Sequence, residues 1–68
     1  MKLRVEFEQE TDGRWIAEVT DLAGVTAYGK TRDEALVAVE ALALRVIADR
    51  IENGELGSFP SSLMFEAA

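Results

Sequence analysis

The sequence predicts an α+β fold in which four strands form one sheet and a single long helix covers one face of it. Three observations predict this fold. Apolar and polar residues alternate on both sides of an Asp-Gly pair, a long apolar segment with helical periodicity follows, and a short alternating segment comes last. A period of two is typical of half-buried strands, and a period near 3.6 is typical of helices. The 68 residues are therefore expected to form one domain, residues 1–68, without a separate DNA-binding domain.

The first two predicted strands, residues 2–10 and 15–20, form a hairpin. Each segment places apolar side chains at every second position and charged side chains between them. The pair Asp12-Gly13 lies between the segments, and this dipeptide is a common hairpin turn.

The hydrophobic pattern selects the register of this hairpin. A two-residue loop would place Phe7 opposite Glu18, whereas a three-residue loop places Phe7 opposite Ala17 and keeps one face apolar. The three-residue loop is therefore predicted, with Gly13 in the left-handed conformation of a bulged turn. It places Glu6 opposite Glu18 on the outer face, where water and salt screen their repulsion.

A short third strand over residues 25–28 leads into the helix. Gly29 is expected to end this strand. Thr31 and Glu34 form a predicted capping box, in which the Thr31 hydroxyl accepts from the backbone of Glu34 and the Glu34 carboxylate reaches back to Thr31. The helix is predicted from about residue 32 to residue 52.

Asn53-Gly54 is the predicted helix stop, and residues 61–68 are the predicted fourth strand, with Leu63 and Phe65 on one face. Three antiparallel strands followed by a right-handed crossover leave the fourth strand parallel to the first. Pairing at the free edge of the first strand gives the strand order 3-2-1-4, which is a truncated ribonuclease H-like arrangement.

The predicted helix is more apolar than a helix on one sheet requires. On a helical wheel, one stripe is expected to pack on the sheet: Leu36, Val39, Leu42, Ala43 and Val46. A second stripe lies on an adjacent side: Val37, Leu44, Ile47 and Ile51. The sheet is not expected to reach this second stripe, so it is predicted to be the interface of a homodimer or larger homo-oligomer. The alternative is that the loop over residues 55–60 folds back over it, with Leu56 and Phe59 as the covers.

Composition excludes several classes of protein. The formal net charge is −6, and cysteine and histidine are absent. Disulfides are therefore impossible, a zinc site is unfavourable, and the basic footprint of a nucleic-acid-binding protein is lacking. The N-terminal segment has no long apolar run, so neither a leader nor a membrane span is expected and a cytoplasmic location is favoured. Arginine outnumbers lysine and amide residues are scarce, which hints at a thermophilic source.

The acidic charge allows binding to a basic protein, although ordinary solubility also accounts for it. Glu6, Glu8 and Glu18 are the predicted partner-facing acidic surface. No catalytic, cofactor-binding or metal-binding residue is predicted, and the protein is not expected to be an enzyme. The alternative is a two-metal nuclease that uses Glu6, Glu18 and Asp21, but acids at this spacing are typical of any solvated strand face.

The segment "DGRWIAEVTDLAGVTAYGKTRDEALVAVEALAL" resembles the HicB-like antitoxin family. The matching residues are Asp12, Gly13, Trp15, Ala17, Glu18, Val19, Leu22, Gly24, Gly29, Thr31, Glu34 and Ala35. The resemblance covers about residues 3 to 52. Thr20 and Ala23 stand where the family often has prolines. Many members continue into a DNA-binding domain, so direct operator binding is not carried over to this chain.

The resemblance implies neutralisation of a HicA-type toxin, a small basic RNA-cleaving protein with a double-stranded-RNA-binding fold. An acidic antitoxin would mask the basic RNA surface and the catalytic histidine of such a toxin. The family also contains short stand-alone members of unknown function, and this chain resembles those most closely. An interaction module is therefore the primary expectation, with the antitoxin role as its specific form.

Overall fold

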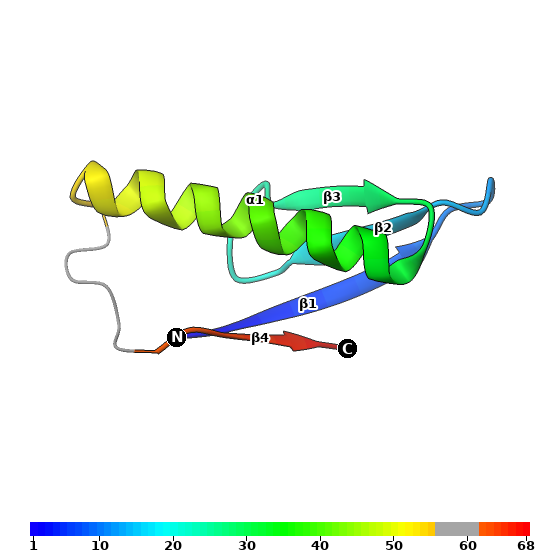
Figure 1. Ribbon diagram of the computed structural model, residues 1–68, viewed down its shortest axis with the longest axis horizontal. Helices are drawn as coiled ribbons and strands as arrows, with labels where there is room; N and C mark the ends of the chain where they lie inside the picture. Colours follow the sequence, from blue (N-terminus) through cyan, green and yellow to red (C-terminus); the bar gives the residue numbers. More distant parts are fainter. Residues whose placement is uncertain (56–61) are drawn as a thin grey trace.

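The computed structural model describes residues 1–55 and 62–68 (Figure 1). Its elements, in chain order, are β1 (Lys2–Gln9), β2 (Trp15–Val19), β3 (Thr26–Gly29), α1 (Arg32–Glu52) and β4 (Met64–Ala67). The four strands form one mixed sheet in the order β3-β2-β1-β4. Strand β4 is parallel to β1, and the other neighbouring strands are antiparallel. The predicted element order, strand order and strand directions are therefore confirmed.

The β1–β2 hairpin has the predicted register. Phe7 pairs with Ala17, so one face of the hairpin is apolar. The Glu10 N–H donates to the Arg14 carbonyl at 2.7 Å, and the Gly13 N–H donates to the Glu10 carbonyl at 3.0 Å. Gly13 has φ of 94°. The three-residue loop with a left-handed glycine is thus confirmed.

The turn between β2 and β3 is hydrogen-bonded to Arg4 of β1. Leu22 and Val25 are buried in the core. The Thr20 N–H donates to the Arg4 carbonyl at 3.2 Å, and the Arg4 N–H donates to Asp21 Oδ2 at 2.8 Å. The Asp21 carboxylate therefore extends the hydrogen bonding of β1 where the β2 backbone turns away.

The start of α1 is capped and lies very close to the end of β3. Thr31 Oγ1 accepts from the Glu34 N–H at 3.1 Å, as predicted. The Glu34 carboxylate instead accepts from the Lys30 N–H at 2.9 Å, one residue before the predicted Thr31. This arrangement still satisfies a backbone donor of the incoming chain. A Cβ on Gly29 would lie 2.8 Å from the Glu34 carbonyl carbon, so the close approach requires glycine.

Helix α1 ends in a Schellman motif. The Gly54 N–H donates to the Ile51 carbonyl at 3.1 Å, and the Glu55 N–H donates to the Arg50 carbonyl at 2.8 Å. Gly54 has φ of 73°, which is the left-handed conformation that this motif needs. The predicted stop at Asn53-Gly54 is therefore confirmed.

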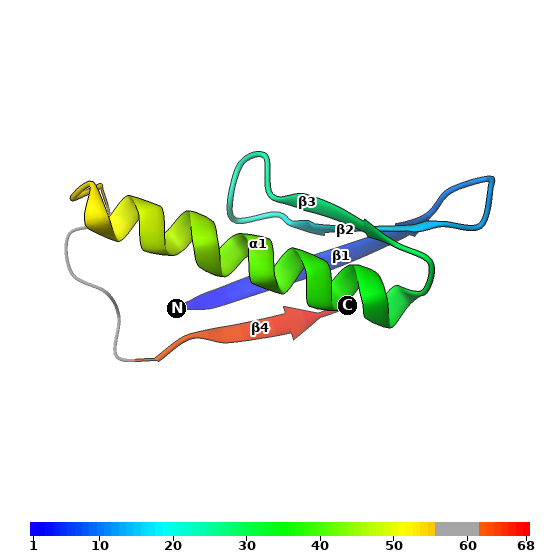
Figure 2. The same cartoon turned by 45° about the horizontal axis from the view of Figure 1, so that its top comes forward.

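The core lies between one face of the sheet and α1, which lies mainly over β2 and β3 (Figure 2). Its buried residues are Leu3, Val5, Ala17, Val19, Leu22, Val25, Ala35, Val39, Ala43 and Ile47. All five residues of the predicted inner stripe face the core. Val39 and Ala43 are buried, and the other three are half-buried: Leu36, Leu42 and Val46. Among the described residues no polar or charged side chain is buried. The stability of the domain therefore depends on apolar packing.

The position of Ile47 corrects the sequence analysis. Ile47 is only 2% exposed within the single chain, so the sheet reaches a residue that was assigned to an oligomer interface. Ala35 and Ala43 belong to the same buried stripe as Ile47, and their small side chains allow the helix to lie close to the sheet. The alternative covers, Leu56 and Phe59, lie outside the described residues.

The N-terminal turn of α1 is tied to both β1 and β4. The Arg32 guanidinium lies 3.9 Å from the centroid of the Phe7 ring, within cation–π range. Arg32 also donates to the backbone oxygen of Ala68. Leu63 and Phe65 are half-buried and pack against the core, as predicted for one face of the last strand. Arg32 thus joins the helix to the edge strand β4, where few other helix contacts exist.

Candidate functional site

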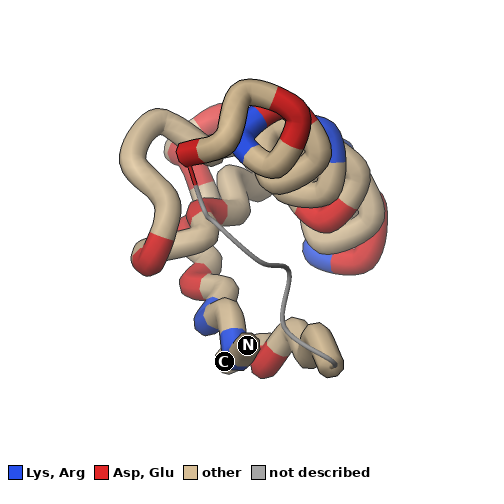
Figure 3. The backbone as a smooth tube through the Cα atoms, turned by 90° about the vertical axis from the view of Figure 1, so that its left-hand side faces the viewer, with Lys and Arg blue, Asp and Glu red and all other residues tan. Residues whose placement is uncertain are grey.

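The face of the sheet opposite α1 is an open surface, called the open face below. Its position follows from strand periodicity, because every second residue of a strand points away from the helix. Figure 3 views the molecule along its length and shows α1 on one side of the sheet only. The outward positions are Lys2, Arg4, Glu6 and Glu8 on β1, Ile16 and Glu18 on β2, Thr26 and Tyr28 on β3, and Met64 and Glu66 on β4.

Three glutamates of the open face, Glu6, Glu8 and Glu18, surround one shallow hollow and are called the acidic trio. All three are exposed. Glu6 and Glu18 are direct cross-strand neighbours, while Glu8 pairs with Ile16. The hollow has a volume of about 200 Å³, and Phe7, Ile16 and Thr26 complete its lining. The structure therefore brings together the three acids that the sequence placed on a partner-facing surface.

The sequence analysis missed the non-acidic lining of this hollow. Ile16 is half-buried and pairs with Glu8 on one side and Tyr28 on the other. The signal for it was present, because the alternation that turns Glu18 outward also turns Ile16 outward. Thr26 joins the hollow through the register of β3 on β2, which the sequence pattern did not predict.

The negative charge of the acidic trio is not neutralised within the described part of the chain. The ion pairs there are Lys2–Glu66 at 3.2 Å and Arg14–Asp12 at 2.9 Å, and neither includes a member of the trio. Both pairs lie at the ends of the sheet. Lys2 is thus bound to Glu66, and Arg4, the other basic residue of the open face, forms no ion pair with the acidic trio.

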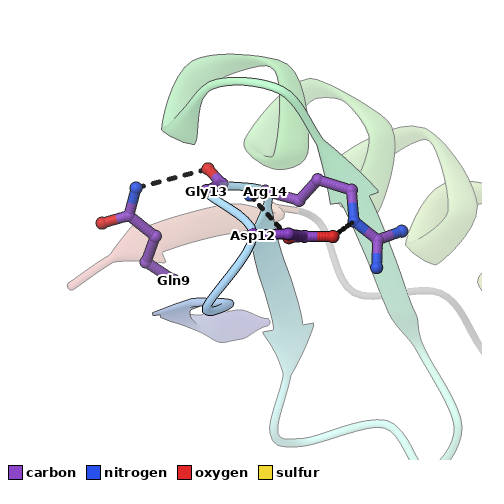
Figure 4. Close-up of polar contacts among 4 residues, drawn as sticks. All are labelled: Gln9, Asp12, Gly13 and Arg14. Atoms are coloured by element: carbon purple, nitrogen blue, oxygen red, sulfur yellow. Dashed lines mark hydrogen bonds and ion pairs between the residues drawn. The ribbon is translucent and has the colours of Figure 1, made fainter.

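The hairpin tip at one end of the open face is internally ordered (Figure 4). The Arg14 N–H donates to Asp12 Oδ1 at 3.1 Å, and Arg14 Nε donates to Asp12 Oδ2 at 2.9 Å. These bonds, the backbone one foremost, hold the pKa of Asp12 below its usual 3.8. Arg14 also lies 5.1 Å from the ring centroid of Tyr28. Arg14 is therefore committed to the tip and does not approach the acidic trio.

The residues named for the nuclease alternative do not act together. Asp21 accepts from the backbone of Arg4, whereas Glu6 and Glu18 lie beside the hollow. Over residues 1–55 and 62–68, no group of three or more acidic side chains is arranged to hold a metal ion. The geometry gives no support to a two-metal site with Glu6, Glu18 and Asp21.

The four residues of the predicted oligomer interface differ in their exposure to solvent. Val37 is 66% exposed and Leu44 is 47% exposed. Ile51 is half-buried against the core, and Ile47 belongs to the core itself. Two of the four residues therefore remain as a clearly exposed apolar surface on α1.

Comparisons of the chain with protein-family models, with curated proteins and with solved structures found no match. Among the described residues, no helix combines the length and apolarity needed to cross a membrane.

Proposed function

We propose that the chain is a protein-interaction module of the HicB-like antitoxin type, and that its open face binds a basic protein. The acidic trio carries this proposal. It gathers three exposed carboxylates around one hollow, on a face that none of the described elements covers. Within the described residues it has no basic partner, so an incoming cationic surface would find its charges available.

The fold supports the same reading. The order β-β-β-α-β and the strand order β3-β2-β1-β4 are those predicted from the sequence, and they support the proposal that the fold is a truncated ribonuclease H-like arrangement. Several residues of the resembling motif have definite structural roles here. Gly13 provides the left-handed turn, Gly29 allows contact between β3 and α1, and Thr31 caps the helix.

The composition of the hollow suits arginine or lysine side chains of a partner. Such side chains have an aliphatic stem and a charged head. Ile16 offers apolar contact for the stem, and the surrounding carboxylates offer acceptors for the head. A HicA-type toxin with a basic RNA-binding surface has the required chemistry.

The test is calorimetric titration with the HicA-type toxin encoded beside this chain, its catalytic histidine replaced to remove RNA cleavage. The variant Glu6→Gln/Glu8→Gln/Glu18→Gln should weaken binding by about tenfold or more, roughly 1.4 kcal/mol. Raising the salt concentration should weaken binding of the unmodified chain.

A matched control removes the same number of negative charges from the end of α1 and the turn after it: Asp49→Asn, Glu52→Gln and Glu55→Gln. This control should change the dissociation constant by no more than about twofold, because charges away from the binding surface contribute weakly. Equal losses for both triple variants would contradict the open face as the binding surface. A chain with no such toxin gene beside it, and no binding to a HicA-type toxin, would contradict the antitoxin role.

A further inference from the structure

The outward side of α1 carries a continuous apolar row, called the helix seam below. Its members are Val37, Ala41, Leu44, Ala48 and Ile51, which are separated by four, three, four and three residues. Val37, Leu44 and Ala48 are exposed, and the other two are half-buried. At 100° per residue, the centre of this row lies about 140° around the helix from the centre of the buried stripe. The seam therefore points away from the sheet.

The spacing of the helix seam is that of a coiled-coil heptad. Ala41 and Ala48 occupy the a positions, and Val37, Leu44 and Ile51 occupy the d positions. Leucine at d is favourable in parallel pairs, and alanine lets two helices approach closely. Neither Ala41 nor Ala48 belongs to the stripes predicted from the sequence, because alanine alone gives little hydrophobic signal.

We propose that the occupant of the helix seam is a second copy of this chain, which pairs in parallel and in register through α1. Charge complementarity supports a second copy of the chain as the occupant and a parallel direction for the two α1 helices. Glu40 and Arg45 flank the seam on opposite sides, at heptad positions g and e. In a parallel pair, a g residue faces the e residue five positions later in the partner, so Glu40 faces the partner's Arg45, and the reverse pair forms by symmetry.

The antiparallel alternative lacks this complementarity. It would set alanines against larger side chains, but each flank would then face the same flank of the other helix. With the two seams centred on Leu44, Arg45 would lie near the partner's Arg45, and Glu40 would face the partner's Ile47 instead of a basic residue. Within the described residues neither Glu40 nor Arg45 takes part in an ion pair, so both are available for the parallel arrangement.

The position of α1 leaves room for a partner. Its C-terminal half extends beyond the end of β3, in both orientations of the ribbon (Figures 1 and 2). The seam is short, so the interface should lie at the small end of specific interfaces and the dimer should dissociate in the micromolar range. Association also stabilises a domain of this size, because a small domain buries a smaller fraction of its unfolded surface than a large one does.

Sedimentation equilibrium from about 5 to 200 μM tests the proposal. The unmodified chain should be dimeric at the upper end, and Leu44→Glu should be monomeric. The matched control is Met64→Glu, because Met64 is 58% exposed but lies on the open face. It should dimerise as the unmodified chain does. If Leu44→Glu fails to fold, Ala48→Glu replaces it, since Ala48 is exposed and its substitution leaves the core intact.

Two further variants test the direction of pairing. The chain has no cysteine, so Val37→Cys introduces a single thiol. A parallel in-register pair brings the two thiols together and should give a disulfide-linked dimer in air, whereas antiparallel pairing about the centre of the seam separates them by about 21 Å along the helix axis at 1.5 Å per residue. Glu40→Arg should raise the dimer dissociation constant about fivefold, and Glu40→Arg/Arg45→Glu should restore it.

Each contrary outcome overturns a definite part of the proposal. An unmodified chain that is monomeric at 200 μM, a value chosen well above the expected dissociation constant, would overturn the dimer. A dimer that persists in both Leu44→Glu and Ala48→Glu would overturn the helix seam. A dimer whose Val37→Cys form does not cross-link, and whose charge-swap pair does not recover, would overturn the parallel arrangement.

Discussion

At the scale of single residues, Gly13 shows how one position sets the geometry of the sheet. Its φ of 94° lies in the region that L side chains rarely adopt, and a Cβ placed there would meet no atom within 4 Å. The cost of a side chain is therefore backbone strain and not a clash. Because the loop length depends on this conformation, Gly13 also determines which residues of β1 and β2 face each other.

Gly13→Val should destabilise the domain by about 1 kcal/mol or more, because a β-branched residue is unfavourable at positive φ. The measurement is urea unfolding followed by circular dichroism. Gly13→Asn is the matched control and should lower the free energy of unfolding by less, since asparagine tolerates the left-handed conformation. Equal stability of the valine variant and the unmodified chain would contradict the bulged turn.

At the scale of elements, α1 has two apolar sides, of which one packs on the sheet and the other is exposed. The buried side holds Val39 and Ile47 against the sheet, and the opposite side presents the helix seam. Sequence periodicity could not separate these sides fully, since apolar residues occupy more than half of the helical wheel. Side-chain size separates the two sides, because the buried Ala35 and Ala43 allow α1 to lie close to the sheet and Ile47 is buried beside them.

The two sides of α1 should respond differently to truncation. Ile47→Val should cost about 0.5–1.5 kcal/mol, because it removes a methylene from a closely packed core. Leu44→Ala should cost much less when both are measured by urea unfolding at a few micromolar, where the chain is mostly monomeric under the proposal above. A larger loss at Leu44 than at Ile47 in this dilute regime would restore the original assignment of Ile47 to the outer stripe.

The elements also show how far sequence reasoning reaches. The register of β1 and β2 followed from one apolar face and one turn glycine, and the capped helix followed from Thr31 and its stop residues. The acidic trio was foreseen because alternation fixes the outward side of each strand. The hollow was not foreseen, because Thr26 joins it through the register of β3 on β2, and only the order of these strands was predicted. The contribution of Ala48 was also missed, because a small side chain adds little to a hydrophobic pattern.

At the scale of the whole molecule, the two proposed surfaces lie on opposite sides of the domain. The open face lies on the side of the sheet away from α1, and the helix seam points away from the sheet. A helix-paired dimer would therefore expose two open faces, each turned away from the dimer contact. Such an arrangement would bind two basic partners without competition between the surfaces.

The resulting expectation is that the two surfaces can be disabled independently. The unmodified chain at 200 μM, above the expected dimer dissociation constant, should bind an inactive HicA-type toxin as two chains with two toxins. Leu44→Glu should bind one toxin per monomer, with a dissociation constant within about threefold of the unmodified chain, because long-range coupling is small when no shared contact is removed. The glutamine variant of the acidic trio should remain dimeric but bind the toxin about tenfold more weakly or worse, as expected above. Light scattering of the mixtures, combined with calorimetry, reports mass and affinity together. If Leu44→Glu loses the toxin while the glutamine variant keeps it, then α1 is the toxin-binding surface and the assignment of the open face is wrong. If both variants lose the toxin, dimerisation is required for binding, and the expected independence of the two surfaces fails.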